Sequence, residues 1–90
     1  MSKTQLFILV KCDSGFAEQV GQEIIDNIPE ALEVFSITGN YDLLVKAGLK
    51  DLESMANIVQ GKLHKIAHIR ETNTFLSFRV FGQDIGDFGD

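Results

Sequence analysis

The apolar residues of this chain follow two kinds of pattern, one typical of strands and one typical of helices. Residues 4–12 are rich in β-branched and bulky apolar side chains and precede Asp13-Ser14-Gly15, which predicts a strand and then a helix capped by Asp13 or Ser14. Apolar residues next recur at helical spacing, at Phe16, Ala17, Val20, Ile24 and Ile28. Pro29, the only proline, is expected to end this helix.

A hairpin is predicted in the middle of the chain. The strand 32–38 would place Leu32 and Val34 on one side and Phe35 and Ile37 on the other. Residues 38–42 have turn chemistry, because glycine and asparagine tolerate positive φ and aspartate can bond to its own backbone. Residues 43–47 provide the returning strand.

A second helix and a last strand complete the pattern. Asp51 is placed to cap the helix, and its apolar stripe is Leu52, Met55, Ala56, Val59 and Leu63. Alternating residues from about His68 to Phe81 predict the strand. The order is β-α-β-β-α-β, which indicates an α+β, ferredoxin-like sandwich.

Both faces of the predicted sheet are apolar. Two helices cover only one face, yet Leu6 and Ile8 alternate with Phe7 and Leu9 in the first strand. We expect a second copy of the same sheet to cover the other face in a two-fold dimer. The alternative is a monomer that leaves some apolar residues exposed.

Composition limits the partners of such a domain. Ninety residues with a net charge of −5 suit one domain, and the three aspartates of residues 83–90 account for more than half of that charge. We therefore divide the chain into a folded domain, 1–82, and an acidic tail, 83–90, which either solvates the molecule or docks through Ile85 and Phe88. The chain has no cluster of basic residues, so we expect no direct binding to nucleic acid.

Rare residues exclude further classes of protein. With a single cysteine, Cys12, an intrachain disulfide is impossible, and we expect a cytoplasmic protein. No apolar stretch reaches the roughly 20 residues of a transmembrane helix, so no membrane association is expected. His64 and His68 are four apart, but the helix pattern ends between them, so we expect no metal site and no cofactor.

The sequence contains no constellation of catalytic groups, and we expect no enzyme. Cys12 lies at a strand end between Lys11 and Asp13, and we interpret it as a packed or half-exposed thiol. The turn at residues 38–42 is the better candidate for chemistry. Its backbone amides could bind a carboxylate and Asp42 an ammonium group, which suits a zwitterion. The alternative is a hairpin that needs Gly39 and Asp42 only for its geometry.

Several short segments resemble those of one family. Ile28-Pro29-Glu30-Ala31-Leu32, Thr38-Gly39-Asn40-Tyr41-Asp42-Leu43-Leu44-Val45, Asp51-Leu52, Ile69 and Thr72-Asn73-Thr74 resemble the effector domain of leucine-responsive regulatory protein/AsnC-type regulators, the module for regulation of amino acid metabolism. The resemblance covers residues 4–81. It implies a ferredoxin-like fold that dimerises through its sheets as a dimeric α/β barrel.

The resemblance also implies a ligand and a place for it. Amino acids bind between dimers of this family, in a ring usually built from four dimers. The implied contacts are Thr38, Gly39, Asn40, Tyr41 and Asp42 of the hairpin and the hydroxyls of Thr72 and Thr74, with Phe35 shaping the pocket. Where members often have glycine before the last strand, this chain has Ala67-His68, which puts the entry of that strand in question.

Three functions remain open at this point. Full-length members of the family begin with a helix-turn-helix DNA-binding domain, so the resemblance implies a stand-alone effector domain that senses an amino acid and changes its assembly, alone or with full-length regulators. The alternative is a structural partner that forms mixed oligomers with those regulators and senses no ligand. A third candidate is a cofactor-free ferredoxin-like oxygenase or isomerase, for which only His64, His68 and Cys12 are available.

Overall fold

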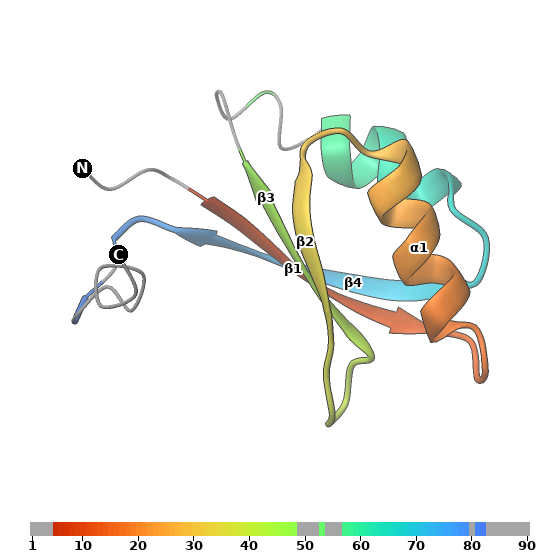
Figure 1. The fold of residues 1–90 in the computed structure, drawn as a ribbon. Helices are drawn as coiled ribbons and strands as arrows, with labels where there is room; N and C mark the ends of the chain where they lie inside the picture. Colours follow the sequence, from red (N-terminus) through yellow and green to blue (C-terminus); the bar gives the residue numbers. More distant parts are fainter. Residues whose placement is uncertain (1–4, 49–52, 54–56, 80, 83–90) are drawn as a thin grey trace.

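The computed structural model is a four-stranded antiparallel sheet with its helical segments on one face (Figure 1). It describes residues 5–48, 53, 57–79 and 81–82. The elements are β1 (Gln5–Cys12), α1 (Ala17–Asn27), β2 (Ala31–Ser36), β3 (Leu43–Gly48), η1 (Asn57–Lys62), η2 (Leu63–Lys65) and β4 (Ile69–Ser77). The strand order β2-β3-β1-β4 and the order of the elements confirm the predicted ferredoxin-like α+β fold.

The core lies between the sheet and the helical layer, because every second residue of β1 and of β3 is apolar and points toward that layer. Ile8 pairs with Val45, and both are fully or almost fully buried, as are their neighbours two residues away on each strand. The helical layer supplies the other half of the core with Val20, Ile24, Ile28, Ile58, Leu63 and Ile66. The predicted stripe of α1 is therefore confirmed, with Phe16 and Ala17 packed at its margin.

The predicted cap of α1 is wrong. The N-cap residue is Phe16, and no side chain caps the helix. Asp13 instead offers its backbone carbonyl to the N–H of Phe16, at 3.0 Å, across a tight turn in which Gly15 has φ +86°. This turn places Asp13 and Ser14 before the helix. At the other end α1 stops at Asn27, two residues before Pro29, as that proline predicts.

The second helical segment differs from the α-helix that its apolar spacing predicted. Asp51, Leu52, Met55 and Ala56 and the side chain of Val59 lie outside the described residues, as does the tail with Ile85 and Phe88. The described part is π-helical in η1 and ends in the short 3₁₀ turn η2. In an α-helix, Ile58 and Leu63 would lie about 140° apart around the axis. The i→i+5 hydrogen-bonding of a π-helix brings them to one face, and both are buried.

Two strand boundaries also differ from prediction. In β2, Ala31 pairs with Ala47 and Glu33 with Lys46, so Leu32 lies in a bulge and is 56% exposed instead of sharing a face with Val34. In the last strand, β4 begins at Ile69 because His68 has a φ of +73°, in the left-handed region. This non-glycine residue therefore takes the backbone geometry for which glycine is best suited.

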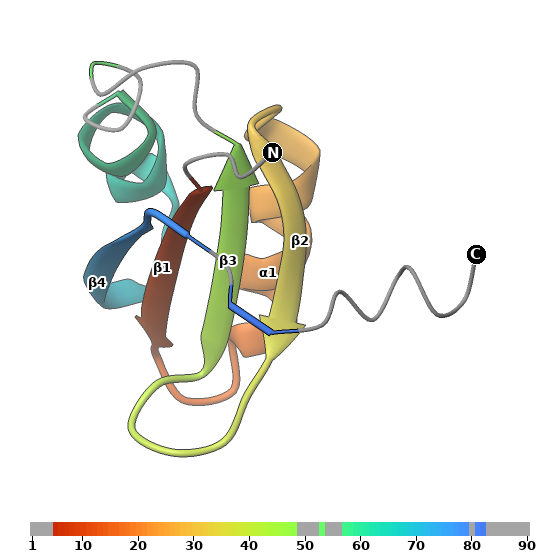
Figure 2. The same ribbon diagram turned by 90° about the vertical axis from the view of Figure 1, so that its left-hand side faces the viewer.

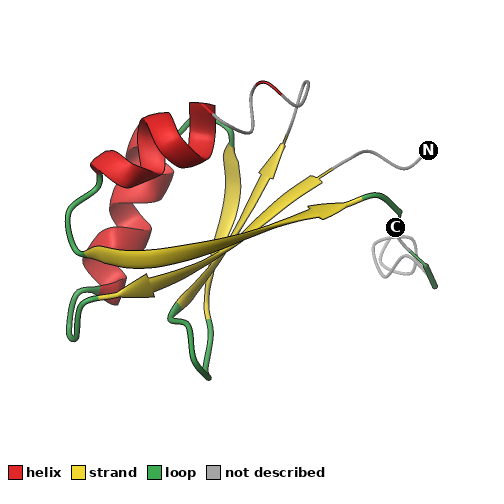
Figure 3. Ribbon diagram, turned by 180° about the vertical axis from the view of Figure 1, so that it is seen from behind, coloured by secondary structure: helices red, strands yellow, loops and turns green. Residues whose placement is uncertain are grey.

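The uncovered face of the sheet carries a large apolar surface, as the alternation of β1 predicts, beside the ion pair of Lys46 and Glu33. Figure 2 shows this face toward the viewer, with α1 and the η segments behind it, and Figure 3 shows the fold from behind. The register places side by side on this face the residues Phe7, Leu9, Leu44, Phe35 and Phe75. Phe35 is 42% and Phe75 is 48% exposed, which leaves a hydrophobic surface across all four strands.

The strained backbone at His68 leads to a testable prediction. We expect His68→Gly to be more stable than His68→Ala by about 1 kcal/mol, because both variants lack the imidazole and only alanine keeps the unfavourable positive φ. Urea unfolding of the two variants measures the difference. Ala67→Gly is the control, since its φ is not positive, and there glycine should lower stability. Equal stability of the two His68 variants would contradict the prediction.

Candidate ligand-binding hairpin

Asp42 anchors the hairpin loop between β2 and β3. The N–H of Ile37 donates to the carbonyl of Asp42 at 3.0 Å, and the N–H of Asp42 donates to the carbonyl of Val10 at 2.9 Å. The Asp42 carboxylate accepts a hydrogen bond from the N–H of Cys12 through Oδ2, at 2.8 Å. One aspartate thus joins the base of the loop to the end of the central strand. The sequence allowed Asp42 a structural role in the hairpin but did not identify Cys12 as its partner.

The rest of the loop stands away from the sheet. Thr38, Gly39 and Asn40 are exposed, and Gly39 has a φ of +112° with open space where a Cβ would be. Two contacts tether the loop toward its neighbours. Lys11 Nζ donates to the carbonyl of Asn40 at 3.0 Å, and the hydroxyl of Tyr41 donates to Glu71 Oε2 at 3.2 Å. Among the described residues, the backbone N–H groups of Gly39, Asn40 and Tyr41 have no hydrogen-bond partner.

The structure does not bring all of the predicted site residues to one face. Thr72 pairs with Val10 and Thr74 with Ile8, so both threonines lie on the helix-covered side of the edge strand β4. Phe35 pairs with Leu44 on the uncovered side. The hairpin loop lies at the Thr72 end of the sheet, since Asp42 bonds to Val10. A single site containing Phe35 and the threonines would therefore need more than one chain.

The end of β1 carries a polar cluster that sequence analysis missed. Asp13 Oδ2 lies 3.2 Å from Nδ1 of His68 and its Oδ1 lies 3.8 Å from Nε of Arg70. The imidazole of His68 stacks on Phe16, with ring centroids 3.6 Å apart and planes 8° apart. The cluster joins the turn before α1 to the start of β4. Its contacts with Asp13 and Phe16 hold the His68 ring in position. Among the described residues no three histidine, cysteine or acidic side chains gather into a metal site.

Cys12 is packed, the first of the two states that the sequence analysis allowed. Its side chain is buried in the core. Burial, followed by the negative charges of Asp42 and Asp13, raises the pKa of the Cys12 thiol above its ordinary value of 9.0. The neutral thiol is thereby favoured, which suits a packed side chain and not a thiolate nucleophile. Of the described helices, none is long and apolar enough to cross a membrane.

The neighbouring charge on Asp42 gives a pH-dependent prediction. Asp42→Asn should lower the pKa of Cys12 toward 9.0, because the amide keeps an oxygen for the N–H of Cys12 and loses the charge. A thiol whose pKa is raised in the folded state adds stability that is fully present below about pH 9 and is lost as the pH rises through the folded-state pKa. Because this pKa is lower in the variant, the variant should lose less stability between neutral and alkaline pH. The ultraviolet absorbance of the thiolate against pH measures the shift. Asp26→Asn on α1 is the control, and equal Cys12 pKa values in both variants would contradict the prediction.

Comparison with known proteins identifies relatives of this chain. The chain is 36% identical over 84 residues to the uncharacterized HTH-type transcriptional regulator PYRAB16920 of Pyrococcus abyssi, covering 91% of this chain and 56% of that regulator. It thus spans about half the length of the curated relatives that it matches.

Solved structures share the fold. The crystal structure of TTHA0845 from Thermus thermophilus superposes with a TM-score of 0.81 at 29% identity, over 89% of this chain and 99% of that one. The transcriptional regulator NMB0573 of Neisseria meningitidis, solved in complex with L-Met, has a TM-score of 0.78 at 20% identity, over 91% of this chain and 54% of that one. The family model for the Lrp/AsnC ligand binding domain matches residues 5–85, and the chain belongs to this family.

Proposed function

We propose that this domain binds a free amino acid at the hairpin loop and that the bound amino acid changes the assembly of the domain. The observation that carries the proposal is the fixed position of Asp42, whose carboxylate is half-buried and oriented by the N–H of Cys12 at 2.8 Å. A carboxylate held at the base of an exposed loop offers a charge for a ligand's ammonium group. Membership of a ligand-binding family and the L-Met complex of NMB0573 support this class of ligand.

The loop also offers donors for the carboxylate end of the ligand. The amide groups of Gly39, Asn40 and Tyr41, which have no partner among the described residues, can donate to a carboxylate as a backbone anion site. The hydroxyl of Thr38 lies next to them in the chain. Two kinds of group of opposite polarity on one loop can select a zwitterion over a simple anion or a simple amine.

Assembly of several copies would bring Phe35, Thr72 and Thr74 into the proposed site. The uncovered sheet face carries a broad apolar surface, and a second copy seated on it would bury Leu9, Leu44 and Phe35. Because Phe35 and the two threonines, Thr72 and Thr74, lie on opposite faces of one chain, neighbouring copies would supply them to a shared site between dimers. A ligand held between dimers favours the assembled state by its differential affinity for that state.

We propose no catalytic role. The curated relatives that the chain matches are transcriptional regulators. Two of the three candidate catalytic groups have other surroundings in the structure, since Cys12 is packed in the core and His68 stacks on Phe16. A whole regulator's interaction with DNA would lie outside this domain, which itself has no basic cluster.

Neutralising Asp42 tests the sensing function. We expect Asp42→Asn to fold and to assemble, because its amide oxygen still accepts from Cys12, but to lose the response to amino acids with its charge. Light scattering with and without a panel of amino acids measures the change in size. The wild-type chain should respond to at least one amino acid, and the variant at least about tenfold more weakly, which corresponds to about 1.4 kcal/mol.

Asp26→Asn, which neutralises an exposed carboxylate on α1, is the matched control and should respond like the wild type. Absence of any amino acid response in the wild type would overturn the sensing function. Retained mixing with full-length regulators in that case would favour the alternative of a structural partner.

A charge on the uncovered face tests the dimer. Leu9 lies on the central strand of that face, so Leu9→Lys should place a charge in the middle of the proposed interface and yield a folded monomer. Analytical ultracentrifugation measures the mass of the particle. Ile25→Lys is the control, since Ile25 is an exposed apolar residue on α1, on the opposite layer. An unchanged assembly of Leu9→Lys would contradict a sheet-to-sheet dimer.

A further inference from the structure

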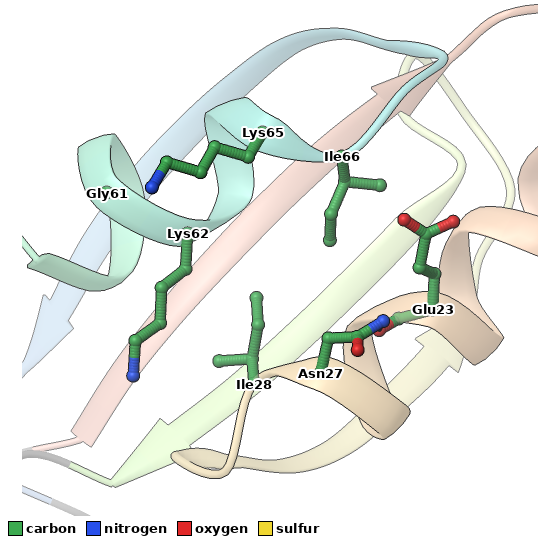
Figure 4. Close-up of a pocket in the computed structure, with 7 residues that line it drawn as sticks. All are labelled: Glu23, Asn27, Ile28, Gly61, Lys62, Lys65 and Ile66. Carbon is green, nitrogen blue, oxygen red and sulfur yellow. The ribbon is translucent and has the colours of Figure 1, made fainter.

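A cleft of about 350 Å³ opens between α1 and the η1–η2 segment, in the helical layer and away from the hairpin. Figure 4 shows the residues that line it, which are Glu23, Asn27, Ile28, Gly61, Lys62, Lys65 and Ile66. Its volume lies at the low end of the range of ligand pockets, about 300–1,000 Å³, so it suits a small molecule better than a nucleotide.

The end of η1 forms one side of this cleft, with Gly61 and Lys62. A π-helical segment is rare and is frequent at functional sites. Gly61 has no side chain, and a Cβ there would meet nothing within 4 Å. Ile28 and Ile66, 2% and 7% exposed, point toward each other from the two sides of the cleft (Figure 4). The floor is therefore apolar and held in place by the core.

The rim of the cleft carries opposite charges on its two sides. Lys62 and Lys65 come from the η segments, whereas Glu23 and Asn27 come from α1 (Figure 4). Lys62 is already neutralised, because its Nζ lies 2.8 Å from both carboxylate oxygens of Glu30. Within the described residues, the ammonium of Lys65 and the carboxylate of Glu23 have no ion-pair partner. One cation and one anion without an ion-pair partner thus border the cleft, on either side of its two isoleucines, with the Lys65 side chain extending toward Gly61 (Figure 4).

We propose that this cleft is a second binding site, for a small α-amino acid with an apolar side chain. The ligand's carboxylate pairs with Lys65, its ammonium group pairs with Glu23, and its side chain packs on Ile28 and Ile66. Asn27 adds an acceptor for the ammonium, since its Nδ2 donates to the Glu23 carbonyl at 3.0 Å and leaves Oδ1 available. Because both charged groups reach solvent, we expect a dissociation constant of about 1 mM.

The site does not depend on the hairpin. It lies within one chain, it uses none of the residues of the loop, and its ligand needs no neighbouring copy. Binding in the cleft and binding at Asp42 can therefore succeed or fail separately.

Isoleucine methyl NMR can report both sites in one titration, even in a large assembly. Ile28 and Ile66 line the cleft, whereas Ile37 bonds to Asp42 at the base of the hairpin loop. We would titrate the full chain with L-leucine up to about 10 mM, and in parallel with 4-methylpentanoate, which lacks the amine, and 3-methylbutylamine, which lacks the carboxylate. We expect leucine to shift the methyl signals of Ile28 and Ile66, and each analogue to bind at least about tenfold more weakly.

Two charge variants and one control localise the effect. Lys65→Gln and Glu23→Gln should each weaken the leucine-induced shifts of Ile28 and Ile66 at least about fivefold. Both residues reach solvent, so the other isoleucine signals should remain those of the folded chain. Glu18→Gln neutralises an exposed carboxylate at the other end of α1 and should bind leucine like the wild type.

The possible results separate the site from the proposed function. Selective leucine shifts at Ile28 and Ile66 that both charge variants weaken would support the cleft. Shifts confined to Ile37 would overturn the cleft and leave the hairpin function standing. Equal shifts with leucine and both analogues would overturn the zwitterion as its ligand, and unmoved Ile28 and Ile66 signals would overturn the site.

Discussion

The structure depends on one strand that is apolar on both faces. β1 lies between β3 and β4, so each of its residues contributes to the interior of the sheet. Ile8 and its alternate neighbours are buried under the helical layer, while Phe7 and Leu9 lie on the face that the chain itself leaves uncovered. A ninety-residue domain has a small hydrophobic core. Burying the second face of the sheet would add buried apolar area and so stabilise the folded domain further. This constraint underlies the proposed dimer.

The C-terminal end of the same strand also contacts the hairpin loop proposed to bind the ligand. At Cys12 its backbone N–H orients Asp42, and one residue later Asp13 contacts His68. The hairpin loop is therefore held at its base by the sheet and left exposed at its tip, which is how a rigid scaffold usually presents binding residues. The cleft between α1 and η1 follows a different principle, because it is a gap in the helical layer with charges on opposite sides. The two proposed sites use separate residues of one small fold.

The sequence predicted regular elements well and local geometry less well, for a physical reason that particular residues show. Val20 and Ile24 were placed in the core by 3.6-residue spacing, because one helix alone fixes which of its residues share a face. The same spacing missed Ile58, since η1 adopts a π-helical geometry that no apolar pattern specifies. Asp13 is a residue type that commonly caps helices. Here a tight turn places it before the helix, and its carboxylate contacts His68 instead.

The sequence by itself determined the order of the elements, the two apolar faces of the sheet and the hairpin with its glycine and aspartate, because these follow from periodicity and turn chemistry between near neighbours in the chain. Only the tertiary structure decided that Asp42 bonds to Cys12, thirty residues away, and that Thr72 and Phe35 lie on opposite faces. It also decided that Glu23 and Lys65 border one cleft. Such contacts depend on strand register and on how the helical layer packs, and both are set by the whole fold at once.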